Sequence, residues 1–337
     1  MSESPRRATA LAHPNIALAK YWGKQPFGHN LPAVPSLSVT LDGMSTETTV
    51  TFDDGLADDE LVLNGSPASG TPLARVKGLL DRVREAARVG ARARVTSAND
   101  FPTASGLASR ASAFAALALA ASAAAGLSST PAELSDLARR TSVSSARSVF
   151  GGYVELPVGA PGDTYLPASE VAARDHWNLA IVVAVTREGA KDVSSSDGMA
   201  HTRATSPYFK GWMESAPETF ARVRAALLAK DLRALGEAAE HSALAMHAAA
   251  LAARPAVLYF TPATVAAIEG VHRLRRDGVT AYATIDAGPH VKVITTLEET
   301  DRVAAFMEAV PGVLRTIRTR PGGPARLVAS GPTVRSA

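Results

Sequence analysis

Hydrophobic and polar positions along the chain follow two periods, which predict strands and helices in both halves. Residues 36–52 alternate apolar and polar positions and are rich in Val and Thr, so they read as strands with a turn at Asp42-Gly43. Residues 91–100 are a further predicted strand. Residues 72–89 have apolar side chains at helical spacing, which predicts an amphipathic helix with one side formed by Leu73, Val76, Leu79, Leu80 and Val83.

Two more helices are predicted in the first half. An Ala-rich segment favours a helix from about 107 to 125. Thr130 as N-cap, Pro131 in the first turn and Glu133 three residues after the cap indicate the start of the next helix.

The rest of the chain, from about residue 150, repeats the mixture of strands and helices. Residues 150–159 resemble a strand and turn, the apolar run 179–186 predicts a buried strand, and 206–255 is largely helical. Two strands, within 278–288 and 290–297, flank the turn at Gly288-Pro289. This order indicates an α+β fold with a boundary near 160–178, and we place two domains at residues 1–178 and 179–337.

Composition narrows the class of protein. The 337 residues are 46% hydrophobic and 20% charged, which predicts a sizeable core. The formal charge of +3 comes from scattered residues without a basic stripe, so nucleic-acid binding is not expected. The N-terminal residues contain no signal-like apolar stretch, and the longest apolar run is too short to span a bilayer, so we expect a cytoplasmic protein without a membrane segment. There is no cysteine, and the eight histidines lack metal-site spacing.

Four segments contain candidate chemistry, although the GxxxxGK[ST] and GxGxxG motifs are absent. FPTASGLASRAS (101–112) places small residues before a helix, which suits an anion such as phosphate; a structural turn is the alternative. NIALAKYWGKQ (15–25) brings Lys20, Tyr21 and Lys24 together and suits an anionic substrate, or is a strand with solvated lysines. RRTSVSSARSVFGG (139–152) contains Ser142, Ser144 and Arg147, which suit phosphate or carboxylate, or is a polar turn. In TIDAGPHVKV (284–293), Asp286 is a candidate general base or a turn-capping residue.

Taken together, these segments resemble the diphosphomevalonate decarboxylase family of the GHMP kinase superfamily. The family patterns NIAxxKYWGK, FPTAAGLASSA, GSGSACRSxFGG, KKxVSSxxGM and DAGPN are matched in order by NIALAKYWGK, FPTASGLASRA, TSVSSARSVFGG, AKDVSSSDGM and DAGPH. The resemblance implies a two-domain GHMP-kinase-like fold, with a ribosomal-S5-like N-terminal ATP-binding domain and a ferredoxin-like C-terminal domain that completes the substrate site. It also implies a homodimer.

The resemblance implies an ATP- and Mg2+-dependent reaction of the mevalonate pathway. The 3-hydroxyl of mevalonate 5-diphosphate is phosphorylated, and loss of that phosphate and of carbon dioxide gives isopentenyl diphosphate. Asp286 would be the base, Lys20 its partner and Arg147 the ligand of the substrate carboxylate or phosphates. The remaining substrate contacts would be Tyr21, Lys24, Ser142, Ser144, Ser195 and Ser196. The ATP site would comprise Ser97, Asn99, Ser105, Gly106, Leu107, Ala108, Ser109 and Arg110, with few protein ligands for magnesium.

The chain departs from the family pattern at several positions. Arg110 replaces the second serine of GLASSA, so it either points away or supplies positive charge near the transferred phosphate. Thr141 and Val143 replace glycines, and His290 replaces the asparagine of DAGPN. These changes leave phosphomevalonate decarboxylase as the nearest alternative activity. A mevalonate 3-kinase ranks lower, because the Asp286, Lys20 and Arg147 set is complete. A non-catalytic nucleic-acid-binding relative also ranks lower, because the sequence contains no Lys/Arg stripe with interleaved aromatic residues.

Overall fold

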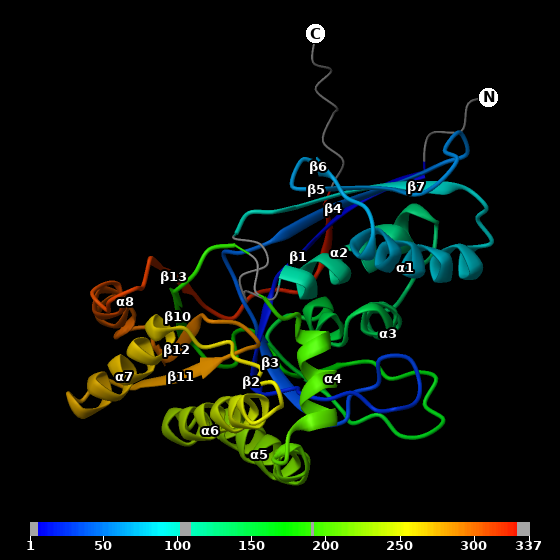
Figure 1. The fold of residues 1–337 in the computed structure, drawn as a ribbon. Coiled ribbons are helices and arrows are strands. Elements are labelled where there is room, and N and C mark those ends of the chain that lie inside the picture. The colour runs from blue at the N-terminus through cyan, green and yellow to red at the C-terminus, as the bar shows by residue number, and fades with distance from the viewer. Residues whose placement is uncertain (1–5, 102–108, 190–191, 329–337) are drawn as a thin grey trace.

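The computed structural model describes residues 6–101, 109–189 and 192–328 and has two connected parts (Figure 1). The first part is a six-stranded sheet in the order β14-β1-β4-β7-β5-β6, with helices on one face. Its strands are β1 (Arg6–Ala12), β4 (Thr46–Asp53), β5 (Glu60–Leu63), β6 (Ser66–Pro67), β7 (Arg92–Asn99) and β14 (Arg326–Val328). Its helices are α1 (Thr71–Ala87), α2 (Ser109–Ala124) and α3 (Pro131–Thr141).

A four-stranded sheet lies at the centre, in the order β2-β3-β8-β9. Its strands are β2 (Asn15–Ala19), β3 (Ser36–Thr40), β8 (Tyr153–Leu156) and β9 (Ser169–Ala172). The 3-10 helix η1 (Val143–Val149) packs beside β2, β3 and β8. Strand β2 belongs to the candidate segment 15–25, and η1 belongs to the candidate segment 139–152. Because η1 packs against the sheet that contains β2, these two candidate segments lie close together.

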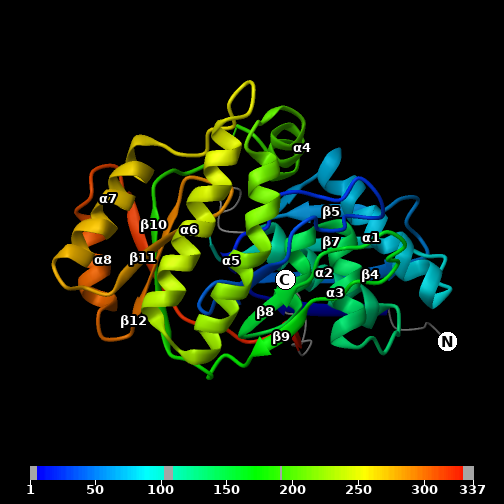
Figure 2. The same cartoon turned by 90° about the horizontal axis from the view of Figure 1, so that it is seen from below.

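The second part is an antiparallel four-stranded sheet in the order β11-β12-β10-β13, and helices cover both of its faces (Figure 2). Its strands are β10 (Leu179–Val185), β11 (Ala281–Ile285), β12 (Val291–Thr296) and β13 (Arg315–Thr319). The helices of this half are α4 (Ser195–Thr205), α5 (Phe209–Ala229), α6 (Leu232–Leu251), α7 (Pro262–Arg276) and α8 (Thr300–Glu308).

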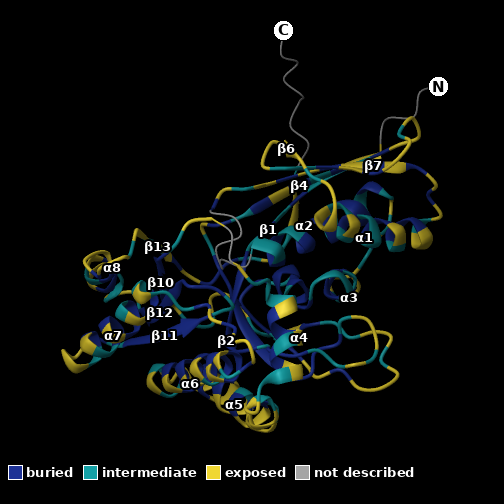
Figure 3. Cartoon of the chain, viewed as in Figure 1, coloured by how far each residue is buried: buried dark blue, intermediate teal, exposed yellow. Residues whose placement is uncertain are grey.

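The apolar run of β10 is continuous because both faces of the strand are covered. Ile181 and Val183 belong to the core under α5 and α6, whereas Val182 and Ala184 belong to the core under α7 and α8. The first of these cores also includes residues of β2 and β3, so α5 and α6 connect the central sheet to the second part. Figure 3 shows the central strands buried and the outer faces of these helices exposed.

Most of the predicted elements are confirmed. Helix α1 buries Val76, Leu79, Leu80 and Val83, and Leu73 is partly buried. Helix α3 begins with the expected capping box, in which Thr130 Oγ1 accepts a hydrogen bond from the Glu133 N–H and a Glu133 carboxylate oxygen accepts one from the Thr130 N–H. The strands on either side of the Asp42-Gly43 turn do form, but they join different sheets rather than pairing with each other.

Candidate active site

The candidate base and its lysine come from opposite halves of the chain and meet as an ion pair. Asp286 follows β11 and Lys20 follows β2, and the Lys20 Nζ donates a hydrogen bond of 2.6 Å to Asp286 Oδ1. The lysine side chain is 1% exposed, and its ammonium also donates to the Ala17 carbonyl at 2.8 Å. Burial lowers the pKa of Lys20 to about 8, although the Asp286 carboxylate opposes the shift. The pair therefore exists only because the two halves pack together.

A second lysine flanks the same carboxylate. Lys292, on β12, is fully buried, and its Nζ lies 3.4 Å from Asp286 Oδ2. Burial alone would raise the pKa of Asp286, but the positive charges of Lys20 and Lys292 outweigh it and hold the pKa at about 2. Among the described residues, none donates a well-aligned hydrogen bond to Oδ2. The oxygen is thus ionised, buried and able to accept a proton.

Arg147 is held rigidly under the candidate substrate cavity. Its Nε donates to Ser38 Oγ at 3.0 Å, its Nη1 to Ser36 Oγ at 2.7 Å and its Nη2 to Asn15 Oδ1 at 3.5 Å. Asn15 is itself fixed, because its amide donates to Ser148 Oγ at 2.7 Å. Burial lowers the pKa of Arg147 to about 10, and Asp286 opposes this shift, so the guanidinium stays charged. Two of its five N–H donors remain for a ligand.

The first cavity, of about 170 Å³, brings together the predicted catalytic and substrate-binding side chains. Of the residues that the structure describes, five cations line it but only one carboxylate, Asp286, so the charge of the lining favours an anion. The hydroxyl of Tyr21 is buried in this wall and has no hydrogen-bond partner among the described residues. The predicted site residues in its lining are Lys20, Tyr21, Lys24, Ser109, Arg110, Ser142, Ser144, Arg147, Ser195, Ser196 and Asp286.

Helix α4 approaches this cavity closely because Gly198 has no side chain. A Cβ atom at Gly198 would lie 2.4 Å from the Tyr259 hydroxyl oxygen and 3.2 Å from the Trp22 ring. Ser194 caps the helix by accepting a hydrogen bond from the Asp197 N–H at 3.2 Å. The close packing and the cap place Ser195 and Ser196 in the cavity wall.

A second cavity, of about 510 Å³, adjoins the first and is mostly apolar. Apolar side chains from β5, β7, α1 and α2 line it, which is the surface that a flat aromatic base needs. The lining residues are Thr48, Leu61, Leu63, Thr71, Pro72, Arg75, Val76, Val95, Ser97, Arg110, Ala113, Phe114, Leu117, Ser194 and Asp197.

Arg110 and Arg75 line both cavities and so mark their junction. Arg110 lies in the first turn of α2. Burial is the largest cause that lowers the pKa of Arg110, and repulsion from Arg75 lowers it further, while attraction to Asp197 opposes the shift. Arg110 therefore lines the cavities rather than the outer surface. The junction concentrates positive charge at the start of a helix, where an anion is also favoured by the helix dipole.

The ATP-site predictions are only partly placed. Ser97 lines the second cavity, and its Oγ lies 2.9 Å from Thr48 Oγ1. Asn99 accepts a hydrogen bond from Thr46 Oγ1 at 2.6 Å and is not among the lining residues of either cavity. The predictions for Ser105, Gly106, Leu107 and Ala108 lie outside the described residues.

Sequence reasoning missed several residues of the site. Lys292 was detectable as a charged residue inside an otherwise uncharged strand, because a buried lysine seldom occurs without a partner. Asn15 stood in the quoted motif NIALAKYWGK, and Ser36 and Ser38 stood in the predicted strand segment 36–52, but none of the three had an assigned role. Arg75 had no local signal, because a partly exposed arginine on an amphipathic helix is ordinary.

Comparisons with known proteins agree with this arrangement. Residues 12–166 match the diphosphomevalonate decarboxylase-like N-terminal domain, and residues 181–321 match the mevalonate 5-diphosphate decarboxylase C-terminal domain. Diphosphomevalonate decarboxylase mvd1 of Aspergillus fumigatus is 36% identical over 327 residues, covering 91% of this chain and 81% of the relative. Phosphomevalonate decarboxylase of Haloferax volcanii is 35% identical over 298 residues, covering 88% and 90%.

Solved structures extend the likeness to three dimensions. Mevalonate diphosphate decarboxylase from Staphylococcus aureus superimposes with a TM-score of 0.91 at 35% identity, covering 97% of this chain and 99% of that one. A structure described as MDDEF in complex with MVAPP, AMPPCP and magnesium has a TM-score of 0.90 at 38% identity, covering 96% and 99%.

Proposed function

Because the chain belongs to the diphosphomevalonate decarboxylase family, we propose that it catalyses the ATP-dependent decarboxylation of mevalonate 5-diphosphate to isopentenyl diphosphate. One observation carries the proposal. The buried Asp286–Lys20 pair faces a cationic cavity, and that cavity joins an apolar one of a size suited to adenosine. The enzyme acts in the mevalonate pathway as a decarboxylase.

The reaction begins with attack of the substrate 3-hydroxyl oxygen on the terminal phosphorus of ATP, which breaks the bond to ADP, and the hydroxyl proton is lost during this step. Asp286 Oδ2 accepts that proton, because Oδ1 is already occupied by Lys20 and Oδ2 has an open lone pair. With a pKa near 2 the aspartate is a weak base. It therefore contributes mainly by holding the hydroxyl oxygen in line with the phosphoryl group. It receives the proton as phosphoryl transfer makes that proton acidic. Lys20 and Lys292 keep the carboxylate ionised and fix its orientation.

Loss of carbon dioxide follows departure of the newly transferred phosphate. The two free N–H donors of Arg147 orient the substrate carboxylate. The bond that joins this carboxylate to the carbon chain then breaks, and its electron pair forms the double bond as carbon dioxide leaves. Ser36, Ser38 and Asn15 prevent the guanidinium from rotating. The 5-diphosphate is bound by Lys24, Tyr21, Ser142, Ser144, Ser195 and Ser196.

ATP and Mg2+ are the cosubstrate and metal of the reaction. The second cavity would hold the adenosine, and Arg75, Arg110 and the start of α2 would hold the phosphates at the junction of the two cavities. Ser109, Ser194 and Asp197 are oxygen donors beside this junction, which fits an ion that prefers oxygen and shares the ATP phosphates. When bound, the ion neutralises charge that develops on the transferred phosphoryl group.

The enzyme is further proposed to be a cytoplasmic homodimer. Family resemblance supports the dimer, and light scattering of the purified protein tests it. Among the described residues, no helix is long and apolar enough to cross a membrane.

A parallel assay tests the function. Mevalonate, its 5-phosphate and its 5-diphosphate are each supplied with ATP, and formation of ADP and carbon dioxide is measured. We expect both products from the 5-diphosphate at the highest kcat/KM. A preference for the 5-phosphate would instead support the activity of the Haloferax relative, which is 35% identical to this chain. ADP without carbon dioxide would indicate a kinase.

A further inference from the structure

Lys24 has an unusual partner for a cation in a phosphate-binding wall. Its Nζ donates a hydrogen bond of 2.6 Å to the side-chain oxygen of Asn30, and no ion pair of Lys24 occurs among the described residues. Burial lowers the pKa of Lys24, and repulsion from Arg75 and Arg110 adds to this, while Asp197 opposes it. The ammonium is therefore held by a neutral oxygen in a region of net positive charge.

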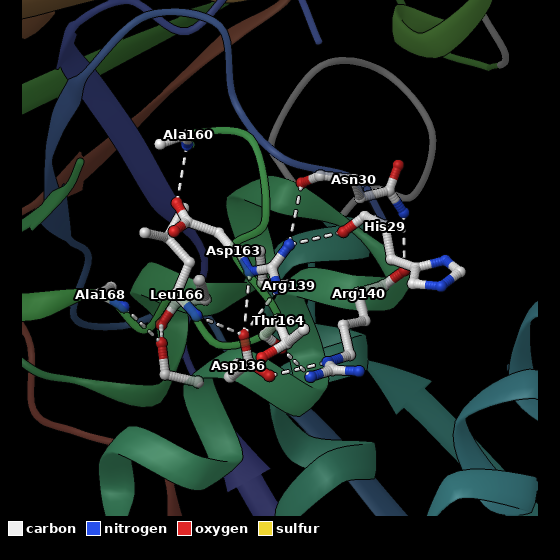
Figure 4. Close-up of polar contacts among 12 residues, drawn as sticks. His29, Asn30, Asp136, Arg139, Arg140, Ala160, Asp163, Thr164, Leu166 and Ala168 are labelled. Atoms are coloured by element: carbon white, nitrogen blue, oxygen red, sulfur yellow. Dashed lines mark hydrogen bonds and ion pairs between the residues drawn. The ribbon is translucent and has the colours of Figure 1, made fainter. Parts of the chain in front are cut away.

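Asn30 is itself fixed through its side-chain amide, its own backbone carbonyl and the carbonyl of the preceding residue. Its Nδ2 donates to the Arg140 carbonyl at 2.6 Å, and its own carbonyl accepts from Arg139 Nη1 at 3.2 Å (Figure 4). Arg139 also donates to the His29 carbonyl at 2.6 Å. The φ angle of Asn30 is +53°, a left-handed conformation that asparagine tolerates better than most residues.

The support beneath Asn30 is a buried ion pair. Arg139 Nη2 donates to Asp136 Oδ1 at 2.6 Å, and these two side chains are 1% and 6% exposed (Figure 4). Asp136 Oδ2 also accepts from Arg140 Nε at 2.7 Å. Because the carbonyls of His29 and Asn30 are held by Arg139, the loop keeps its anchor even without the Asn30 amide.

We propose that Asn30 is a positioning residue, whose side-chain oxygen holds the Lys24 ammonium ready to bind a phosphate of the substrate. This inference rests on the proposed function, in which Lys24 contacts the 5-diphosphate. A carboxylate at residue 30 would hold the lysine equally well but would neutralise it. The amide orients the cation and leaves its full charge for the ligand.

The backbone of Lys24 is fixed by contacts that do not involve Asn30. The amide of Asn30 therefore affects only the side chain of Lys24. The Lys24 carbonyl accepts a hydrogen bond of 2.6 Å from Arg203 Nη1 on α4. The loop also closes through the Gln25 N–H, which donates to the Leu31 carbonyl at 2.9 Å. Removing the amide therefore frees the flexible lysine side chain, which must then be ordered when substrate binds.

The first variant is Asn30→Gly, which deletes the amide and suits the positive φ. We expect the KM for mevalonate 5-diphosphate to rise about three- to tenfold, with kcat within about twofold and the KM for ATP unchanged. Asn30→Asp keeps the size of the side chain and loses the bond to the Arg140 carbonyl, but Arg139 still holds the carbonyls of residues 29 and 30, so this variant tests the idea even if the glycine variant folds poorly. It should raise KM further, because its carboxylate neutralises Lys24 and repels the phosphate.

A double-mutant cycle with Lys24→Met separates positioning from a general structural role. If Asn30 acts through Lys24, Asn30→Gly should cause almost no further loss in the Lys24→Met background. Multiplicative losses, or a fall in kcat at constant KM in Asn30→Gly, would overturn the proposal. Unchanged substrate KM in both Asn30 variants would overturn it as well.

Binding of inorganic pyrophosphate, measured by calorimetry, keeps this test separate from the proposed function. Pyrophosphate should bind the wild type more tightly than Asn30→Gly, and equally weakly to Lys24→Met and the double variant. If the wild type shows no decarboxylation but the pyrophosphate pattern holds, the proposed function fails and the positioning role stands. If decarboxylation is normal but pyrophosphate binds all four proteins equally, the positioning role fails alone.

Discussion

Replacing Asp286 by asparagine should separate catalysis from nucleotide binding. Asp286→Asn keeps the shape of the side chain, and its oxygen can still accept from Lys20, but the negative charge between Lys20 and Lys292 is lost. General-base contributions are about 10²- to 10⁴-fold, so kcat should fall at least about 10²-fold. Asp286 does not line the second cavity, so affinity for ATP should change little.

The same substitution should alter stability in a pH-dependent way. Breaking a buried ion pair costs about 3–5 kcal/mol, since an ammonium is left without its anion. Lys20 already has a pKa of about 8, below its usual value of 10.5, and without the carboxylate that pKa falls further. The unfolded state then binds more protons than the folded state over this range, so the stability of the variant rises with pH up to about 10.5.

Three measurements check this reasoning. Steady-state release of ADP and carbon dioxide gives kcat, binding of an ATP analogue gives nucleotide affinity, and urea unfolding at pH 7 and pH 9 gives stability. Asp54→Asn is a matched control, because Asp54 is exposed and lies outside both cavities. A near wild-type kcat in Asp286→Asn would refute the role of the carboxylate. If the variant loses more stability relative to the wild type at pH 9 than at pH 7, the lowered pKa of Lys20 in the absence of the carboxylate is refuted.

Four further predictions follow from the site. Arg147→Lys keeps the charge but loses the bonds to three partners, so the substrate KM should rise and kcat should fall; unaltered kinetics would remove Arg147 from the site. Arg110→Ser should change the ATP KM and the magnesium dependence together, and if both stay at wild-type values Arg110 does not contact the phosphates. Ala113→Leu should fill the second cavity and raise the ATP KM with little effect on the affinity for mevalonate 5-diphosphate, which direct binding of each ligand checks. Because Lys20 must be protonated to pair with Asp286 and has a pKa of about 8, kcat/KM should fall as the pH rises through about 8; a flat profile to pH 9.5 would contradict this.

Local sequence determined the elements and much of the candidate chemistry. The apolar spacing of α1 and the Thr130–Glu133 capping box were readable because each depends on residues within a few positions. The motifs around Lys20, Arg147 and Asp286 were readable through family resemblance, and the structure brings these three residues to one cavity. Local patterns, however, say nothing about which residues meet across the fold.

Tertiary packing decided how the site is assembled. Lys20 and Asp286 are 266 positions apart and meet only because α5 and α6 join the central sheet to the second part of the molecule. Lys292 is buried against the same carboxylate, and Arg110 lies at the junction of the two cavities, where residues of distant segments meet. Helical and strand periodicity shows which side of an element is buried. A buried charge, however, is tolerated only when an oppositely charged or hydrogen-bonding partner lies beside it. Here that partner comes from a distant part of the chain, so no short stretch of sequence contains it.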